Sequence, residues 1–81
     1  MGKELKVIKE SSLNKKEYRV IKITEYQDTD RGKIVYGIKH IVQVRNVVIW
    51  IDIKEFEGLS EINEIDAIEL FDKIINPYKY G

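Results

Sequence analysis

The sequence of 81 residues contains no cysteine, one histidine and one proline. Without cysteine, a disulfide framework, a thiolate metal site and a cysteine nucleophile are excluded, which favours a reducing compartment such as the cytoplasm. Because His40 stands alone, one chain cannot build an imidazole pair or a metal site from several histidines. We expect His40 to be buried and hydrogen-bonded within a sheet.

Long apolar runs are also missing. No stretch approaches the roughly 18 apolar residues of a membrane span, and the N-terminus has no apolar core of signal-peptide length. No glycine-rich phosphate loop and no activated serine arrangement occurs. The sequence therefore predicts a cytoplasmic protein outside the membrane that uses neither cofactor nor metal.

Charge of both signs is present in equal amount, but it is unevenly distributed. Residues 1–45 carry eleven basic and six acidic side chains, whereas residues 46–81 carry three and eight. From Glu55 to Asp72 there are seven carboxylates and no lysine or arginine. This surface is either a solvated helix face or a surface that docks on a basic partner or mimics nucleic acid.

Residues 34–53, IVYGIKHIVQVRNVVIWIDI, predict a β-hairpin. A two-residue turn at Arg45-Asn46 places the apolar side chains of both strands on one face and gives a cross-strand ion pair on the other. The predicted pairs are Val44–Val47, Val42–Ile49, His40–Ile51, Ile38–Ile53 and, on the opposite face, Lys39–Asp52.

The segment before this hairpin predicts two more strands. Residues 17–27 are rich in Tyr, Val, Ile and Thr, and the turn residues 28–32 join them to the next strand. Pairing Ile23 with Ile38 and Ile21 with His40 would place both isoleucines in the core. Residues 3–9 predict a short strand, so that residues 1–16 form a weak edge strand and a loop.

A helix is predicted from a cap at Ser60 or Asn63 to about Asn76, before Pro77. Its apolar side chains form one broad stripe, and Glu61, Glu64, Glu69, Asp72 and Lys73 are expected to face outward. Residues 77–81 are expected to be a frayed tail. We therefore predict one α+β domain over residues 1–81, with three or four antiparallel strands and the C-terminal helix on one face. The face it covers is expected to hold Ile21, Ile23, Ile38, Val42, Ile49, Ile51 and Ile53.

The opposite, outward face of this predicted sheet is half apolar, with lysines and arginine between the apolar side chains. By the same pairing its apolar members are Tyr18, Val20, Tyr26, Val35, Ile41, Val48 and Trp50, interleaved with Lys22, Lys33, Lys39, Arg45 and Lys54. Such a patch is usually a contact surface. Three uses remain open: a homodimer, a protein partner anchored on aromatics, and single-stranded nucleic acid stacked on them.

Two acidic patterns allow a metal-binding alternative. Asp52-Ile53-Lys54 is half of a D-x-K nuclease motif and, on a regular strand, would aim both charged side chains to one face. Asp28 and Asp30 resemble the start of a calcium loop, but the later ligands are absent. The Lys39–Asp52 pair and ordinary turn chemistry explain these residues without a metal.

The second half of the chain resembles a pattern found in small phage and mobile-element proteins. There, a tryptophan-bearing strand, here 48–53, is followed by a Phe56-Glu57 loop and an acidic helix, here 64–71. The resemblance implies a non-enzymatic accessory protein that binds and inhibits a host factor, such as a CRISPR or other defence component.

Together these patterns predict a protein that acts by binding and not by catalysis. The expected contact residues are Trp50, Tyr18, Tyr26, Ile41 and Lys39 on the sheet face, and Glu64, Glu69 and Asp72 on the acidic helix. A single-stranded nucleic acid bound to the basic-aromatic face is the alternative.

Overall fold

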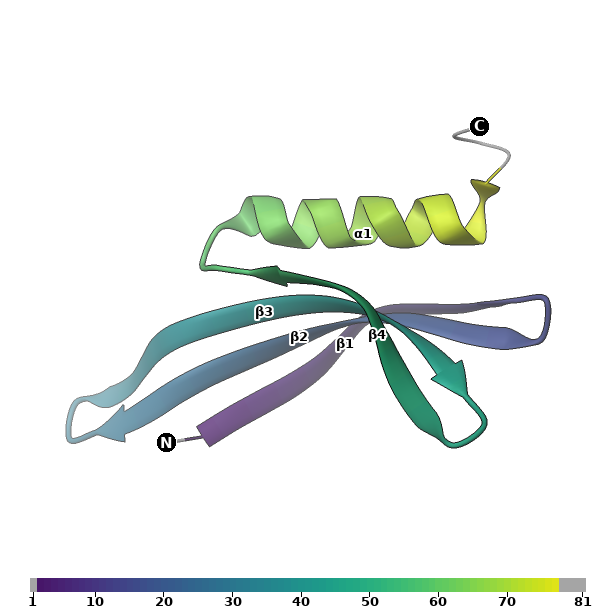
Figure 1. Cartoon of the computed structure of the whole chain (residues 1–81). Helices are drawn as coiled ribbons and strands as arrows, with labels where there is room; N and C mark the ends of the chain where they lie inside the picture. The colour runs from purple at the N-terminus through teal and green to yellow at the C-terminus, as the bar shows by residue number, and fades with distance from the viewer. Residues whose placement is uncertain (1, 78–81) are drawn as a thin grey trace.

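The computed structural model describes residues 2–77 and confirms the α+β architecture, with a four-stranded antiparallel sheet under one C-terminal helix (Figure 1). The elements are β1 (Gly2–Leu13), β2 (Lys16–Thr29), β3 (Gly32–Asn46), β4 (Ile49–Glu57) and α1 (Glu61–Ile75). The strands lie in the order β1-β2-β3-β4. Every connection between neighbouring strands is therefore a hairpin, and the helix crosses above the sheet. Residues 78–81 of the predicted tail lie outside the described range.

The first hairpin is longer than predicted, because β1 continues through residues 11–13, which were expected to be a loop. Its turn is Asn14-Lys15, and both residues have positive φ, 53° and 65°. This is the pattern of a type I′ turn, whose twist matches that of the strands it joins. Strand β1 pairs with β2 along its length and shifts register once, at Ile8.

The hairpin of β2 and β3 confirms the predicted turn but not the predicted register beyond it. Thr29 pairs with Gly32, and the pairing next to the turn follows the predicted alignment. Tyr36 is then an extra residue in β3, a β-bulge, and the register shifts by one. Ile23 consequently lies opposite Lys39 instead of Ile38. Since neighbouring strand residues alternate between faces, this one-residue shift reverses the predicted faces of β2.

The hairpin of β3 and β4 turns at Val47-Val48, two residues later than predicted. Val44 pairs with Ile51 and Gln43 with Asp52, so the predicted pairs Val44–Val47 and Lys39–Asp52 are wrong. The later turn extends both strands and adds cross-strand pairs, although it forces Val47 to φ 59°. Ile53 is a further bulge, the third in the sheet after Ile8 and Tyr36, and beyond it Val42 pairs with Lys54 and His40 with Phe56.

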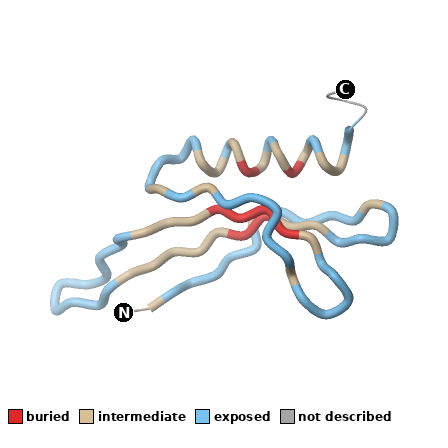
Figure 2. Tube along the Cα trace, in the orientation of Figure 1, coloured by how far each residue is buried: buried red, intermediate tan, exposed pale blue. Residues whose placement is uncertain are grey.

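These registers decide which side chains face the helix. The core consists of Val20 and Val42 from the sheet and Ala67 and Phe71 from the helix, all fully or almost fully buried. Partly buried residues packed around it are Ile8, Tyr18, Phe56, Leu70, Ile74 and Ile75. The predicted core residues Ile49, Ile51 and Ile53 are exposed instead. Ile21 is buried as predicted, but it pairs with Ile41 on the other face of the sheet. Figure 2 shows that burial is concentrated in the part of the sheet beneath the helix, while the hairpin ends are mostly exposed.

Helix α1 begins and ends where the sequence predicts. The hydroxyl of Ser60 accepts a hydrogen bond from the Ile62 N–H at 3.2 Å, which caps the helix N-terminus. At the other end, the Asn76 N–H donates to the Asp72 carbonyl at 2.8 Å. Gly58, with φ 139°, turns the chain from β4 toward the helix, and its N–H donates to the Ile38 carbonyl. The helix is thereby tied to β3 and laid across all four strands.

Candidate functional site

The aromatic side chains predicted to share one sheet face are divided between both faces. Tyr18 packs against the core under the helix. Tyr26, on the same strand and at the same parity, faces the same side, where the ammonium of Lys33 lies 4.4 Å from its ring centroid. Trp50 lies on the opposite, open face, paired with Arg45. The basic-aromatic platform that both sheet-face hypotheses require is therefore not formed by these three residues.

Trp50 is held in a polar row that crosses β2, β3 and β4. The guanidinium of Arg19 stacks over its ring, 4.0 Å from the centroid. The Arg19 Nε–H donates to Gln43 Oε1 at 2.8 Å, and the Gln43 amide donates to Asp52 Oδ1 at 2.7 Å. One side of the indole is thus covered by a cation from its own chain, which leaves less of it for a partner.

The arrangement of this row is incompatible with the D-x-K interpretation, which needs Asp52 and Lys54 on one face. Asp52 is the partner of Gln43 on the open face, whereas Lys54 pairs with Val42 on the helix side. The bulge at Ile53 separates them, so the two charged side chains do not aim to one face. Within residues 2–77, no group of three or more His, Cys, Asp or Glu side chains is placed to hold a metal ion.

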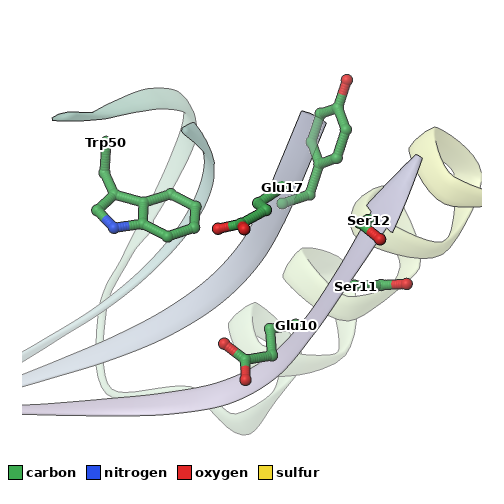
Figure 3. Close-up of a pocket in the computed structure, with 6 residues that line it drawn as sticks. Glu10, Ser11, Ser12, Glu17 and Trp50 are labelled. Carbon is green, nitrogen blue, oxygen red and sulfur yellow. The ribbon is translucent and has the colours of Figure 1, made fainter. Parts of the chain in front are cut away.

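A shallow groove of about 270 Å³ lies beside Trp50 (Figure 3). Its lining residues come from β1, β2 and β4: Glu10, Ser11, Ser12, Glu17, Tyr18 and Trp50. Glu17 forms an ion pair with Arg45 at 3.0 Å. Glu10 is the second carboxylate that lines the groove. Carboxylates repel phosphates, so the groove does not favour the nucleic-acid alternative at Trp50.

The other two predicted sheet-face residues are also engaged within the chain. Ile41 is buried on the open face between β2 and β4. Lys39 lies near two carboxylates, 3.6 Å from Glu25 and 3.8 Å from Glu55. These carboxylates, Glu55 first, raise the pKa of Lys39 above its ordinary value. Lys39 is therefore a fixed cation in an internal ion cluster.

On the helix, only one of the three predicted acidic contact residues faces outward. Glu64 points toward the sheet, where Oε2 lies 3.9 Å from His40 Nε2. Asp72 forms an ion pair with Lys9 at 2.8 Å. Glu69 is exposed. The expectation that all three face solvent is wrong for Glu64 and Asp72, because the helix is rotated to bury Ala67 and Phe71.

The same rotation exposes an apolar surface that the sequence did not reveal. Leu59, Ile62 and Ile65 are 63%, 63% and 62% exposed. We call these three residues the outer helix patch. They repeat every third residue. Ile62 and Ile65 lie on the side of α1 away from Ala67 and Phe71, and Leu59 precedes the Ser60 cap. Glu61, Asp66 and Glu69 lie around them, so the patch is apolar at its centre and acidic at its rim.

A signal for this patch was present in the width of the apolar stripe. Ile62, Ile65 and Ile68 extend the stripe well beyond the residues that contact the sheet. A helix resting on one sheet can bury only part of its circumference, so a stripe this wide leaves apolar side chains uncovered. Sequence periodicity alone does not identify which apolar side chains are left uncovered.

A second apolar surface lies at the end of the β3–β4 hairpin and along β4. Val47, Val48, Ile49, Ile51 and Ile53 are all exposed, Val47 and Val48 most of all. Strand β4 is an edge of the sheet, and within residues 2–77 no segment pairs with its outer side. We call these five residues the β4 edge patch. An exposed apolar edge strand is a ready site for pairing with another chain.

Neither the geometry nor known proteins assign a specific chemistry to these surfaces. In the part of the chain that the structure describes, no helix is both long and apolar enough to cross a membrane. Comparison of the chain with known protein families, curated proteins and solved structures finds no match.

Proposed function

We propose that this protein acts by binding another protein through the outer helix patch. The observation that carries the proposal is the exposure of Leu59, Ile62 and Ile65, which are each more than three-fifths accessible and lie three residues apart along the chain. Contiguous exposed apolar side chains with a polar rim are typical of protein contact surfaces. A single exposed apolar side chain, by contrast, would not indicate a contact surface.

The negative charge at the rim of the patch indicates what kind of partner would bind there. Between Glu55 and Asp72 the chain has no lysine or arginine, and Glu61, Asp66 and Glu69 surround the apolar centre. A partner with an apolar pocket ringed by lysine or arginine would bury the isoleucines and meet the carboxylates. The isoleucines would then supply most of the affinity, and the carboxylates would speed the encounter.

The resemblance to phage and mobile-element proteins extends this proposal. It supports a host defence protein as the partner and inhibition as the consequence of binding. The acidic rim is in keeping with that proposal, since proteins that handle nucleic acids present basic surfaces.

The proposal is tested by comparing the immobilised protein with its Ile62→Gln/Ile65→Gln double variant as bait for bacterial proteins. We expect a partner that the wild-type protein retains and the double variant loses by at least tenfold. The matched control is Ile34→Gln, because Ile34 is 58% exposed at the far β2–β3 turn. Equal retention by the wild-type protein and the double variant would exclude the outer helix patch.

The role of the rim is tested separately with the partner so identified. Glu69→Lys should lower the association rate several-fold at low salt, and the effect should shrink at high salt because the charges are screened. An unchanged association rate would show that the carboxylates do not steer binding.

A further inference from the structure

Helix α1 is held to the sheet mainly by its second half. The helix side chains that pack into the core all lie there: Ala67, Leu70, Phe71, Ile74 and Ile75. Asp72 adds an ion pair with Lys9 of β1 at 2.8 Å. In the first half, residues 61–66, no residue is buried, as Figure 2 shows. The core therefore anchors only residues 67–75.

The first half contacts the sheet at His40 instead. Glu64 Oε2 lies 3.9 Å from His40 Nε2. The imidazole is almost fully buried, and neither of its nitrogens has a hydrogen-bond partner in residues 2–77. The Glu64 side chain is 38% exposed, so it can enter solvent at little cost. A buried titratable group thus lies against the part of the helix that the core does not hold.

The charged groups around His40 do not favour an imidazolium in this position. Strand β2 places Lys22 directly opposite His40, and β4 places the uncharged Phe56 on its other side. By strand alternation, the charged groups on this face of the sheet in or beside that row are Lys6 of β1, Lys22 of β2 and Lys54 of β4, and α1 contributes Glu64. One carboxylate therefore stands against three ammonium groups.

We propose that His40 is a proton-sensitive contact: protonation of its imidazole detaches and unwinds residues 61–66 of α1, while residues 67–75 stay docked on the sheet. An imidazolium has two N–H donors, and its burial is costly unless both are hydrogen-bonded. Glu64 can accept from Nε2 alone, so Nδ1 requires water. Because β2, β3 and β4 are joined by backbone hydrogen bonds, the first half of the helix is the element that moves to admit it.

The chain on either side permits this local change. The Gly58 N–H donates to the Ile38 carbonyl at 2.9 Å, which keeps residue 58 on β3, and Ala67 keeps the other end in the core. A helix rises about 1.5 Å per residue and an extended chain about 3.3 Å, so unwinding gives the segment the length to leave the sheet between two fixed ends. Two turns that do not pack on a sheet are also only marginally stable as helix.

The direction of the pH dependence follows from the same contacts. Burial lowers the pKa of His40 in the docked form, Glu64 raises it by less, and Lys22 lowers it further. In the released form the imidazole is hydrated and its pKa returns toward 6.5. Release is therefore favoured progressively as the pH falls below 6.5, and the docked form is favoured above it. Because Ile62 and Ile65 lie in the released segment, acid would also weaken partner binding at the outer helix patch, a consequence that rests on the proposed function.

The test is a pH titration of the wild-type protein and of His40→Leu by NMR, in which Cα chemical shifts report helix residue by residue. Between about pH 7.5 and about pH 4.5, residues 61–66 of the wild-type protein should lose at least half of their helical shift, with the midpoint of the His40 ring signals. Residues 68–75 should keep their helical shifts, and both halves should stay helical in His40→Leu. The proposal is overturned by a protonated His40 with residues 61–66 still helical, by a His40 that stays neutral, by loss of the whole helix at once, or by the same loss in His40→Leu.

A second measurement separates release from an imidazolium that stays docked and pairs with Glu64. Ser60→Ala weakens only the start of the helix, so release should become easier and its midpoint should rise by about 0.7 pH unit. Glu69→Gly, an exposed position in the docked half, destabilises the helix by a similar amount and should leave the midpoint unchanged. A midpoint that Ser60→Ala does not raise, or that Glu69→Gly raises equally, contradicts release of residues 61–66. Neither measurement needs a partner for the outer helix patch, so failure here is separable from failure of the proposed function.

Discussion

His40 lies between β3 and helix α1 with only 2% of its surface exposed. The sequence predicted burial, and the structure confirms it, but the expected hydrogen bond is not formed. Neither ring nitrogen has a hydrogen-bond partner among the described residues, since Glu64 Oε2 is 3.9 Å from Nε2. Burial lowers the pKa of His40 below 6.5, helped by Lys22 of β2 and opposed by Glu64 of α1. The fold therefore favours the neutral form of the imidazole.

This gives stability a pH dependence of definite sign. Above pH 6.5 the imidazole is neutral in both the folded and the unfolded states, so the contribution of His40 is constant. As the pH falls through 6.5 the unfolded chain takes up a proton before the folded chain does, so the free energy of unfolding falls until the folded chain is protonated as well. The slope from one such group is at most about 1.4 kcal/mol per pH unit.

Urea unfolding of the wild-type protein and His40→Leu between pH 5 and 7.5 measures this effect. We expect the wild-type protein to lose stability as the pH falls below 6.5 and the variant to have a flatter profile. His40→Leu should also be more stable at pH 7 by about 1 kcal/mol, because it removes two unsatisfied buried polar atoms. Profiles of equal slope for the two proteins would show that His40 is not the source of the pH dependence.

Val47 is a second residue whose local conformation has a measurable consequence. It is β-branched, yet it adopts φ 59°, a region that branched side chains strongly disfavour. Its side chain is 83% exposed, so little packing is lost when it is removed. Val47→Gly should raise the free energy of unfolding by about 1 kcal/mol.

The matched control is Val48→Gly, the neighbouring turn residue, which is nearly as exposed and does not have a positive φ. That change should leave stability unchanged or lower it. A loss of stability in Val47→Gly would mean that the turn does not sit at residues 47 and 48.

At the scale of the elements, the helix depends on its ends as well as on its buried face. Ser60 satisfies the N–H of Ile62, and Glu61 and Glu64 in the first turn interact favourably with the helix dipole. Gly58 leads into this cap with φ 139°, and a Cβ at that position would lie 2.9 Å from Asn63 Nδ2. The start of the helix is therefore set by Gly58, by the Ser60 cap and by the carboxylates of the first turn.

Ser60→Ala should lower the free energy of unfolding by about 1 kcal/mol, because the capping hydrogen bond is lost. Ser12→Ala, an exposed strand position, is the control and should change stability by less than about 0.5 kcal/mol. Thermal unfolding followed by circular dichroism measures both. Equal effects would contradict a capping role for Ser60.

For the whole molecule, the main feature is a small core between the helix and a long, thin sheet. The principal extents are 50 × 29 × 14 Å, and the buried residues are concentrated in the part of the sheet beneath the helix. Each core side chain therefore carries a large share of the stability. The outer helix patch lies outside this core and is open to contacts.

Phe71→Ala should cost about 3–5 kcal/mol, because it removes the largest fully buried side chain of the core. For a domain of this size that is a large part of the total, so a fraction of the variant should be unfolded at 37 °C. Ile62→Ala, on the same helix, should cost less than about 1 kcal/mol because Ile62 is mostly exposed. Similar losses in the two variants would contradict the observed rotation of the helix.

The sequence by itself determined the elements that depend on neighbouring residues. The turn before Gly32, the Ser60 cap, the end of the helix before Pro77 and the antiparallel order all follow from local chemistry. These features need only a few adjacent side chains and backbone groups. For this reason the fold class could be predicted without the structure.

Only the tertiary structure decided the registers and therefore the faces. Bulges at Ile8, Tyr36 and Ile53 each insert one residue, and a one-residue slip moves every following side chain to the other side of the sheet. The outer helix patch likewise depends on how the helix is rotated over Val20 and Val42, and many isoleucines fit the same periodicity. Bulge position and helix rotation are set by how the whole core packs, which no local sequence pattern specifies.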